Sequence, residues 1–366
     1  MDFKCNNPLH YAISLVFPAL AASLKRFNRQ QKRESSGLSP ILEASFHGNA
    51  IIQRQSMNTH NYPKRDVIFH LTGGGFYAHT IAGDLPYLLD WSGITNSVII
   101  CPEYALLPEH KFPTAVDQIT SVYRSIVSND IVPLLGFKTE KIIVTGEAAG
   151  GNLATALCVK LCLDGIIDLE ALSVPKKVEK SCDYLSNLRE ESYASSAGEV
   201  QSEHQIDAVE IHLPDAIMLC CPFLNMSLEL TPSRVRSIND PVLPRGLIKA
   251  ISDGYLPTAL EVDKTDPVAS PYYAPDEILR VFPPTLLCEC SEDPLLDDSV
   301  HFNTRLRRLG VESDLLAVHN LPHAYWGLIT AKFPEAVQVH LECQSWLLRQ
   351  FQREHRSEKN VSDPSM

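Results

Sequence analysis

The chain has 366 residues, of which 45% are hydrophobic and 21% are charged, and its formal net charge is −12. A chain of this length buries enough apolar surface to fold without disulfides, and its acidic balance argues against nucleic-acid partners, which need a basic face. No apolar run reaches the roughly 20 residues that a membrane-spanning helix needs.

The first 60 residues contain one apolar stretch, Tyr11–Leu24, which allows two interpretations. Lys25-Arg26 follows the stretch and suits the C-terminal end of a helix that packs on the protein or touches a membrane. The Ala-Leu-Ala triplet at 19–21 instead resembles a signal-peptidase site. We expect residues 1–60 to form a helical cap segment in a cytoplasmic protein. The protein would be secreted if residues 1–21 are a signal peptide.

From residue 66 onward, apolar runs of the β type alternate with helical patterns. Predicted strands lie at 67–71, 98–101, 142–144, 216–221, 285–290 and 315–318, and predicted helices lie at 85–91, 114–127, 150–163, 298–309 and 335–351. Near-continuous apolar runs suit strands that are buried on both faces. The alternation predicts the α/β class, with a mostly parallel central sheet and helices on both faces.

Two segments depart from this pattern. Residues 172–212 are rich in Lys, Glu and Ser and almost free of aromatic residues, so they cannot bury enough surface to offset their ordering entropy. We expect a disordered insertion at 172–212 within a domain that spans 61–353. The charged tail at 354–366 is expected to be disordered as well.

The 10 cysteines lack the two paired C-x₂-C spacings of a zinc site. Cys220 and Cys221 are adjacent, and Cys288 and Cys290 alternate within an apolar run. These positions are typical of buried thiols that pack as small hydrophobes. We therefore expect a reducing compartment, no metal and no other cofactor.

A glycine run at 73–75 follows the first predicted strand directly. Glycine lets backbone N–H groups approach a developing oxyanion closely. The run resembles the HGGG oxyanion loop of esterases, with Thr72 in place of the histidine. We expect Gly74 and Gly75 to donate to an oxyanion, together with Ala149 from a second motif.

The second motif spans residues 142–154, where a strand, a turn of small residues and a helix follow one another. This is the context of the nucleophile elbow G-x-S-x-G, whose strained turn needs small residues on both sides. Gly146 and Gly150 occupy the two glycine positions. The central position, which should be Ser, is Ala148.

Asp293 follows the predicted strand at 285–290, and His323 follows the predicted strand at 315–318. The chain order is therefore elbow, Asp, His, as in α/β-hydrolases. This placement favours Asp293 and His323 as the acid and the base of a triad. His70, near the glycine run, has no such placement and receives no role.

Four further segments complete the pattern: Tyr104–His110, Pro232–Arg234, Ser270–Asp276 and Asp293–Val300. With the glycine run and the elbow, they make the chain similar to the hormone-sensitive lipase family of carboxylesterases. The resemblance covers residues 62–350 apart from the insertion. It implies an α/β-hydrolase fold, a helical cap formed by residues 1–60 and by the region around 232–254, and hydrolysis of carboxylic or lipid esters.

The chain differs from the family at three positions. The family elbow reads GDSAGG and this chain reads GEAAGG, so Ala148 replaces the nucleophilic Ser and Glu147 replaces Asp, while Thr72 replaces the loop histidine. An alanine methyl has no lone pair with which to attack an ester carbonyl. Thr145 precedes the turn, and Cys158 lies roughly 15 Å along the helix. The sequence therefore shows no obvious substitute nucleophile.

Two functions stay open. In the first, the chain is a catalytically impaired homologue, a pseudoenzyme whose shell binds an apolar ester or lipid-like ligand. In the second, it is an active esterase or lipase with an unrecognised nucleophile, which the retained Asp293 and His323 favour. The expected partner is a small-molecule ester or lipid-like ligand, with no nucleic acid and a peripheral contact with a membrane or lipid droplet as an option. The sequence does not predict the oligomeric state.

Overall fold

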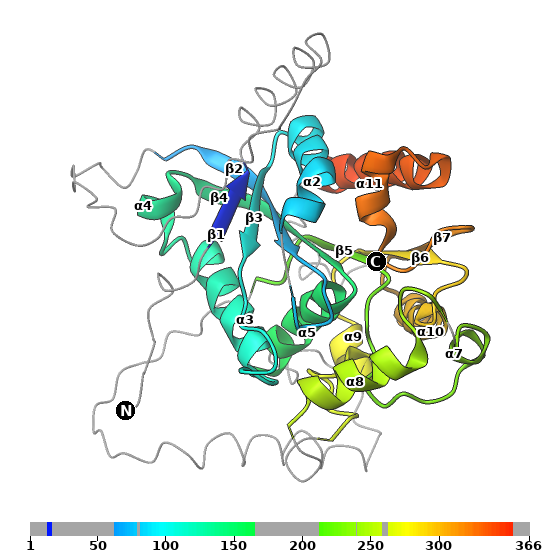
Figure 1. Cartoon of the computed structure of the whole chain (residues 1–366). Coiled ribbons are helices and arrows are strands. Elements are labelled where there is room, and N and C mark those ends of the chain that lie inside the picture. Colours follow the sequence, from blue (N-terminus) through cyan, green and yellow to red (C-terminus); the bar gives the residue numbers. More distant parts are fainter. Residues whose placement is uncertain are drawn as a thin grey trace, which may run out of the picture.

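The computed structural model describes residues 62–78, 81–164, 212–238, 240–257 and 263–353, together with the backbone of residues 13–16. The rest of the predicted N-terminal segment, the predicted insertion up to residue 211 and the predicted tail at 354–366 lie outside the described residues. Figure 1 shows a central twisted sheet with helices on both of its faces.

Within the described residues, the sheet has 7 strands in the order β1-β3-β2-β4-β5-β6-β7. All neighbouring strands are parallel except β1 and β3. The strands are β1 (Ile13–Val16), β2 (Lys64–Leu71), β3 (Val98–Pro102), β4 (Lys138–Glu147), β5 (Ala216–Cys220), β6 (Thr285–Cys290) and β7 (Ser313–Val318). The predicted α/β class with a mostly parallel sheet is confirmed.

Strand β1 corrects the sequence-based expectation for the N-terminal stretch. Residues 11–24 were expected to form a helix, but the part that the structure describes, Ile13–Val16, is a strand. It pairs antiparallel with β3, with Ile13 opposite Pro102 and Val16 opposite Ile99. Two β-branched residues within four favour extended backbone, and pairing covers the edge that β3 would otherwise expose.

The predicted helices are all present, and each observed end lies within four residues of the predicted one. The helices are α2 (Ile81–Thr95), α3 (Thr114–Val127), α4 (Val132–Leu135), α5 (Ala149–Leu163), α7 (Pro232–Arg236), α8 (Arg245–Tyr255), α9 (Asp276–Leu279), α10 (Leu296–Arg308) and α11 (Pro334–Gln352), with 3-10 turns η2 (Pro271–Tyr273) and η3 (Tyr325–Ala331). No helix in these ranges combines the length and the apolar character needed to cross a membrane.

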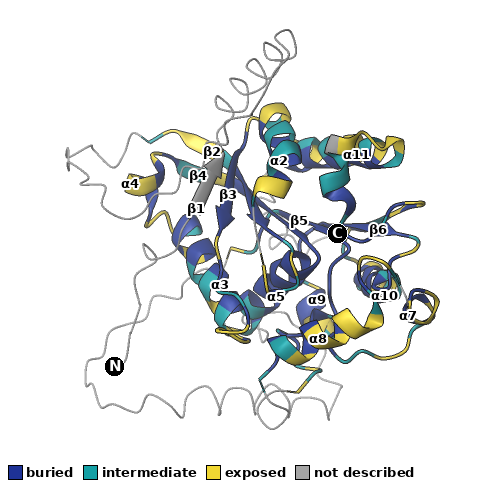
Figure 2. Ribbon diagram, in the orientation of Figure 1, coloured by how far each residue is buried: buried dark blue, intermediate teal, exposed yellow. Residues whose placement is uncertain are grey.

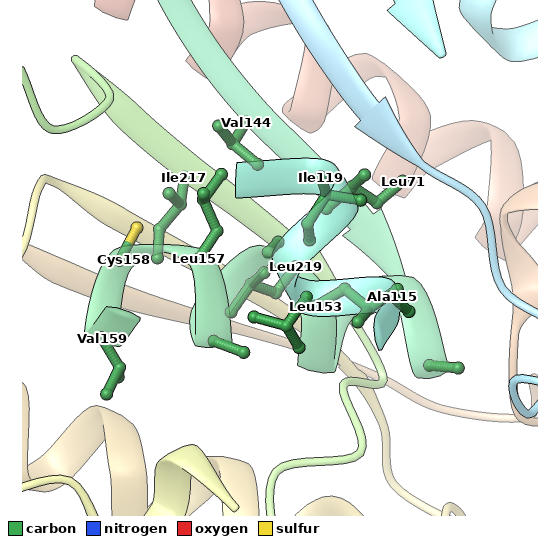
Figure 3. Packing of buried hydrophobic residues seen from close by; sticks show 14 of the residues in the cluster. Leu71, Ala115, Ile119, Val144, Leu153, Leu157, Cys158, Val159, Ile217 and Leu219 are labelled. Atoms are coloured by element: carbon green, nitrogen blue, oxygen red, sulfur yellow. The ribbon is translucent and has the colours of Figure 1, made fainter. Parts of the chain in front are cut away.

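Alternate residues of each strand enter two separate hydrophobic layers. On β2, Val67 and Phe69 join the layer formed with α3 and α5, whereas Ile68 joins the layer formed with α2 and α11. Figure 3 shows the first layer, where Leu153 and Leu157 of α5 point toward the sheet. Figure 2 shows that the central strands are mostly buried, while edge strand β7 and the outer sides of the helices carry intermediate and exposed residues. The sheet therefore forms a rigid platform whose carboxyl edge carries the loops.

Helix α11 closes the second layer. Trp346 and Leu347 of α11 are buried in the same layer as Tyr87 and Trp91 of α2. The end of α11 is also tied to the middle of the sheet, because the Lys141 ammonium of β4 donates a hydrogen bond to the Phe351 carbonyl oxygen at 2.7 Å. A cation at this position suits the negative end of the helix dipole.

Helix α8 packs against the glycine run and the residue after it, and the cap expected around 232–254 stays a prediction. The rings of Phe76 and Tyr255 stack with centroids 3.8 Å apart and planes at 12°. A Cβ added to Gly75 would lie 2.9 Å from the Cδ1 atom of Ile251. Helix α7 is fixed separately by a buried ion pair, in which Arg234 Nη2 lies 2.5 Å from Asp298 Oδ2.

Candidate active site

The turn between β4 and α5 has the geometry of an elbow. Strand β4 ends at Glu147 and α5 begins at Ala149, so Ala148 alone makes the turn. Its φ of 51° and ψ of −112° place a non-glycine residue in a sparsely populated backbone region, which costs about 1–3 kcal/mol and is typical of functional sites. A Cβ on Gly146 would lie 2.3 Å from the Gly150 carbonyl oxygen, so the turn excludes any larger residue there.

Two backbone hydrogen bonds hold Ala148 against the end of β5. The Ala148 N–H donates to the Cys220 carbonyl oxygen at 2.9 Å, and the Phe223 N–H donates to the Ala148 carbonyl oxygen at 3.1 Å. Residues 220–223 therefore lie directly beside the elbow. The parallel arrangement requires this, because the carboxyl ends of neighbouring parallel strands meet at one edge of the sheet.

The fold brings Asp293 and His323 together. His323 Nδ1 lies 2.7 Å from Asp293 Oδ2, and the Leu295 N–H donates to Asp293 Oδ1 at 2.8 Å. Both side chains are buried. Burial on its own would lower the pKa of His323, but the charge and hydrogen bond of Asp293, with a hydrogen bond to Cys221, raise it well above its ordinary value. Asp293 thus orients the imidazole and stabilises its protonated form.

The glycine run lies against the elbow. A Cβ on Gly73 would lie 3.7 Å from the Ala148 Cβ and 3.1 Å from the Glu147 carbonyl oxygen. Gly74 has a φ of +114°, a conformation that L side chains rarely adopt, and a Cβ there would lie 1.8 Å from the Ala78 carbonyl oxygen. Only glycine fits at this position.

The predicted oxyanion donors surround the elbow. Ala149 is the first residue of α5, so its N–H has no partner within the helix. Gly74 and Gly75 directly follow Gly73, the residue of the glycine run that lies against Ala148, and the start of this loop is held by the Tyr104 hydroxyl donating to the Thr72 carbonyl oxygen at 2.7 Å. The position of the three amides is compatible with binding an oxyanion, and their function as donors stays a prediction.

The structure also places the Cys221 thiol at this site, and the sequence analysis gave Cys221 no role there. The Cys221 Sγ atom, a carboxylate oxygen of Asp293 and a ring nitrogen of His323 lie within 4.8 Å of one another. Cys221 was interpreted only as a small hydrophobe in a strand. Its position was available as a signal, because it directly follows β5 at the edge where β4 and β7 also end.

These three side chains offer donor types that zinc sites also use. Both carboxylate oxygens of Asp293 already accept hydrogen bonds, one from His323 and one from the Leu295 N–H. The arrangement therefore matches an acid that orients a base beside a thiol better than it matches three ligands free to bind a cation.

The two side chains considered as substitute nucleophiles lie away from the His–Asp pair. The Thr145 hydroxyl is 2.8 Å from His70 Nδ1, and His70 Nε2 is 3.3 Å from Asp84 Oδ2, so all three belong to a buried polar network. Cys158 is fully buried in the layer between α5 and the sheet.

Glu147, which stands where the family has Asp, lies near Asp84 of this network and interacts with its charge. Its Oε1 atom accepts a hydrogen bond from the Trp326 N–H at 3.2 Å. Burial and the nearby charge of Asp84 raise the pKa of Glu147 to about 7, although His323 and the Trp326 N–H act in the opposite direction. Glu147 therefore supports the loop that follows His323 and changes its charge near neutral pH.

Comparison with known proteins agrees with this geometry. A family model described as alpha/beta hydrolase fold matches residues 67–327. An esterase from Acinetobacter venetianus is 25% identical over 303 residues, covering 82% of this chain and 78% of that esterase. Hormone-sensitive lipase from Mus musculus is 24% identical, covering 74% of this chain and 52% of that lipase. The chain thus spans about half the length of the mouse lipase.

Solved structures of similar fold include carboxyl esterase 2 from Tuber melanosporum, with a TM-score of 0.60 and 18% identity over 78% of each chain. A hormone-sensitive lipase from a metagenome library gives a TM-score of 0.57 at 22% identity, covering 78% of this chain and 76% of the other. At these identities the likeness establishes the fold alone.

Proposed function

Since the chain belongs to the α/β-hydrolase family of hormone-sensitive lipase and related esterases, we propose that it binds a carboxylic ester or lipid-like ligand at the elbow without hydrolysing it by the serine mechanism. The observation that carries the proposal is Ala148, which occupies the strained turn where the nucleophile belongs. Its methyl group can neither lose a proton to His323 nor bond to an acyl carbon.

The parts that would bind an ester are retained around this methyl group. The glycine run contacts Ala148, the Ala149 amide begins α5, and the His323–Asp293 pair is intact. Preorganised amides of this kind stabilise a carbonyl oxygen whether or not a nucleophile follows. The apolar cover above them, Ile251 and the stacked rings of Phe76 and Tyr255, suits an acyl chain.

Restoring the nucleophile tests the proposal. Hydrolysis of p-nitrophenyl butyrate is measured for the wild type, for Ala148→Ser, and for the double variant Ala148→Ser/His323→Ala. We expect Ala148→Ser to gain turnover that the double variant lacks. For scale, loss of the nucleophilic serine from a serine protease lowers kcat on the order of 10⁶-fold. An Ala148→Ser variant no faster than the wild type would show that the remaining groups do not hold an ester productively.

A fluorophosphonate probe separates this proposal from the alternative of an intact serine hydrolase. The probe reacts with an activated serine, so Ala148→Ser should be labelled and the wild type should not. Labelling of the wild-type chain would contradict the proposal, because it would require a reactive serine elsewhere in the protein.

We also propose that the surface of α7, α8 and their connection contacts a lipid surface, from which an apolar ligand would enter. This apolar surface consists of five large side chains between 43% and 63% exposed: Leu230, Val235, Ile238, Val242 and Leu247. Exposed apolar side chains clustered in one short segment mark interaction sites more often than scattered ones do. The segment also carries Arg245, whose guanidinium suits an anionic lipid headgroup.

A further inference from the structure

The thiol of Cys221 lies beside the His323–Asp293 pair. Its Sγ atom lies within 4.8 Å of a His323 ring nitrogen and of an Asp293 carboxylate oxygen. His323 Nδ1 is engaged by Asp293 at 2.7 Å, which leaves Nε2 as the nitrogen that can act as a base. A nucleophile, a base within reach and a third group that orients the base form the recognised arrangement of covalent catalysis.

The backbone fixes Cys221 at this place. Its N–H donates to the Cys288 carbonyl oxygen at 2.9 Å, so residue 221 stays bonded to β6 after β5 has ended. Its φ of 45° lies in the left-handed region, which is uncommon for a residue other than glycine. On the other side, the bonds of Ala148 to Cys220 and Phe223 hold the segment against the elbow. The thiol is therefore positioned from both neighbouring strands.

We propose that Cys221 replaces the missing serine as the nucleophile of a Cys–His–Asp triad and takes the acyl group of a bound ester, a step that rests on the ester binding proposed above. The thiol proton moves to His323, and the thiolate sulfur bonds to the acyl carbon. The carbon–oxygen bond to the alcohol then breaks, and His323 returns the proton to the departing alkoxide. An ester and a thiol thus become a thioester and an alcohol, with no other reactant.

The position of the sulfur determines how far the reaction goes. Cys221 is fully buried, whereas its neighbours Ala148 and His323 each retain 8% of their exposed surface. The ester carbonyl therefore arrives at those two residues, and Sγ meets it through a change of side-chain rotamer. Once acylated, the sulfur is shielded from water, which slows hydrolysis of the thioester. The acyl group is then held on the protein for longer than in a serine esterase.

Acylation can be observed directly on the wild-type chain. The protein is incubated with p-nitrophenyl butyrate, released p-nitrophenol is counted per chain, and intact and peptide mass spectra locate the adduct. We expect release of about one equivalent and a mass gain of one butyryl group on Cys221, removed by neutral hydroxylamine as a thioester is. His323→Ala should acylate more slowly by about 10²–10⁴-fold, the usual contribution of a general base.

Cys221→Ala should lose the adduct, and the matched variant Cys158→Ala, which removes an equally buried thiol from α5, should keep it. If the wild type carries no butyryl group while Ala148→Ser hydrolyses the ester, Cys221 is not the nucleophile, and the proposal that the chain binds an ester is retained. If neither protein reacts, both proposals are wrong. An adduct on a different residue overturns the assignment of Cys221 without relying on any variant.

Discussion

Replacement of Glu147 by Gln should make the protein more stable at alkaline pH. Burial and the charge of Asp84 raise the pKa of Glu147 from 4.5 to about 7. The folded chain therefore binds this proton more tightly than the unfolded chain does. The contribution of Glu147 to stability is full below about pH 4.5 and is lost as the pH rises through about 7. Ionised Glu147 then opposes folding.

The difference between the pKa values of Glu147 in the folded and the unfolded chain sets the size of this change in the free energy of unfolding. At about 1.4 kcal/mol per pH unit, ionisation of Glu147 lowers the free energy of unfolding by about 3 kcal/mol once the pH exceeds about 7. Glutamine has nearly the same shape, keeps an oxygen for the Trp326 N–H and carries no charge. The Glu147→Gln variant should exceed the wild type by about 3 kcal/mol near pH 8 and by less than about 1 kcal/mol near pH 5.

Urea unfolding at both pH values measures the difference. Glu140→Gln is the matched control, because Glu140 lies on the same strand with its side chain 43% exposed and should show no comparable pH dependence. His323 also destabilises the fold as the pH rises, since its pKa is raised, and it interacts with Glu147, so the comparison is repeated in a His323→Ala background. A difference between Glu147→Gln and the wild type that is the same at both pH values would refute the reasoning.

Two further predictions concern the elbow and the apolar surface. Gly150→Ala should lower the free energy of unfolding by about 3 kcal/mol or more, because the new Cβ would lie 2.0 Å from the Leu71 carbonyl oxygen. The control Gly83→Ala should leave the free energy of unfolding unchanged, because a Cβ there would have nothing within 4 Å. Equal urea midpoints for the two variants would contradict this prediction. In a flotation assay with anionic phospholipid vesicles, the wild-type protein should float with the lipid, and a smaller fraction of the Leu247→Asp variant should do so. Wild-type protein that stays in the dense fraction would contradict the proposed lipid contact.

The sequence predicted strands β2–β6 well because each contains an apolar run buried on both faces, and it predicted β7 from the apolar run Leu315–Val318, although only the end residue Val318 of that run is buried. It placed β4 only at 142–144, whereas the strand begins at Lys138, opposite Lys64 of β2. The added residues are polar, and their pairing depends on a distant strand rather than on local hydrophobicity. The same limitation explains β1, whose four residues are extended because the edge of β3 is available to them.

In the candidate site, too, the sequence predicted the residues that belong to motifs and missed those that only the tertiary fold brings together. Motif spacing was sufficient to expect that Asp293 and His323 would meet, and the structure brings them to 2.7 Å. The one sequence signal for Cys221 is its place directly after β5, and its proximity to His323 arises only when β5 and β7 join one sheet. The raised pKa of Glu147 was likewise invisible, since it depends on burial and on Asp84, far away in the sequence.

The position of α11 has a consequence for biosynthesis. This helix covers one face of the sheet and is the last described element to leave the ribosome. Until it arrives, Tyr87 and Trp91 of α2 lack Trp346 and Leu347 as partners in their layer, and Lys141 has no helix end to bind. A nascent chain would therefore leave part of this apolar layer uncovered until α11 is made, and exposed apolar surface of this kind is what chaperones bind.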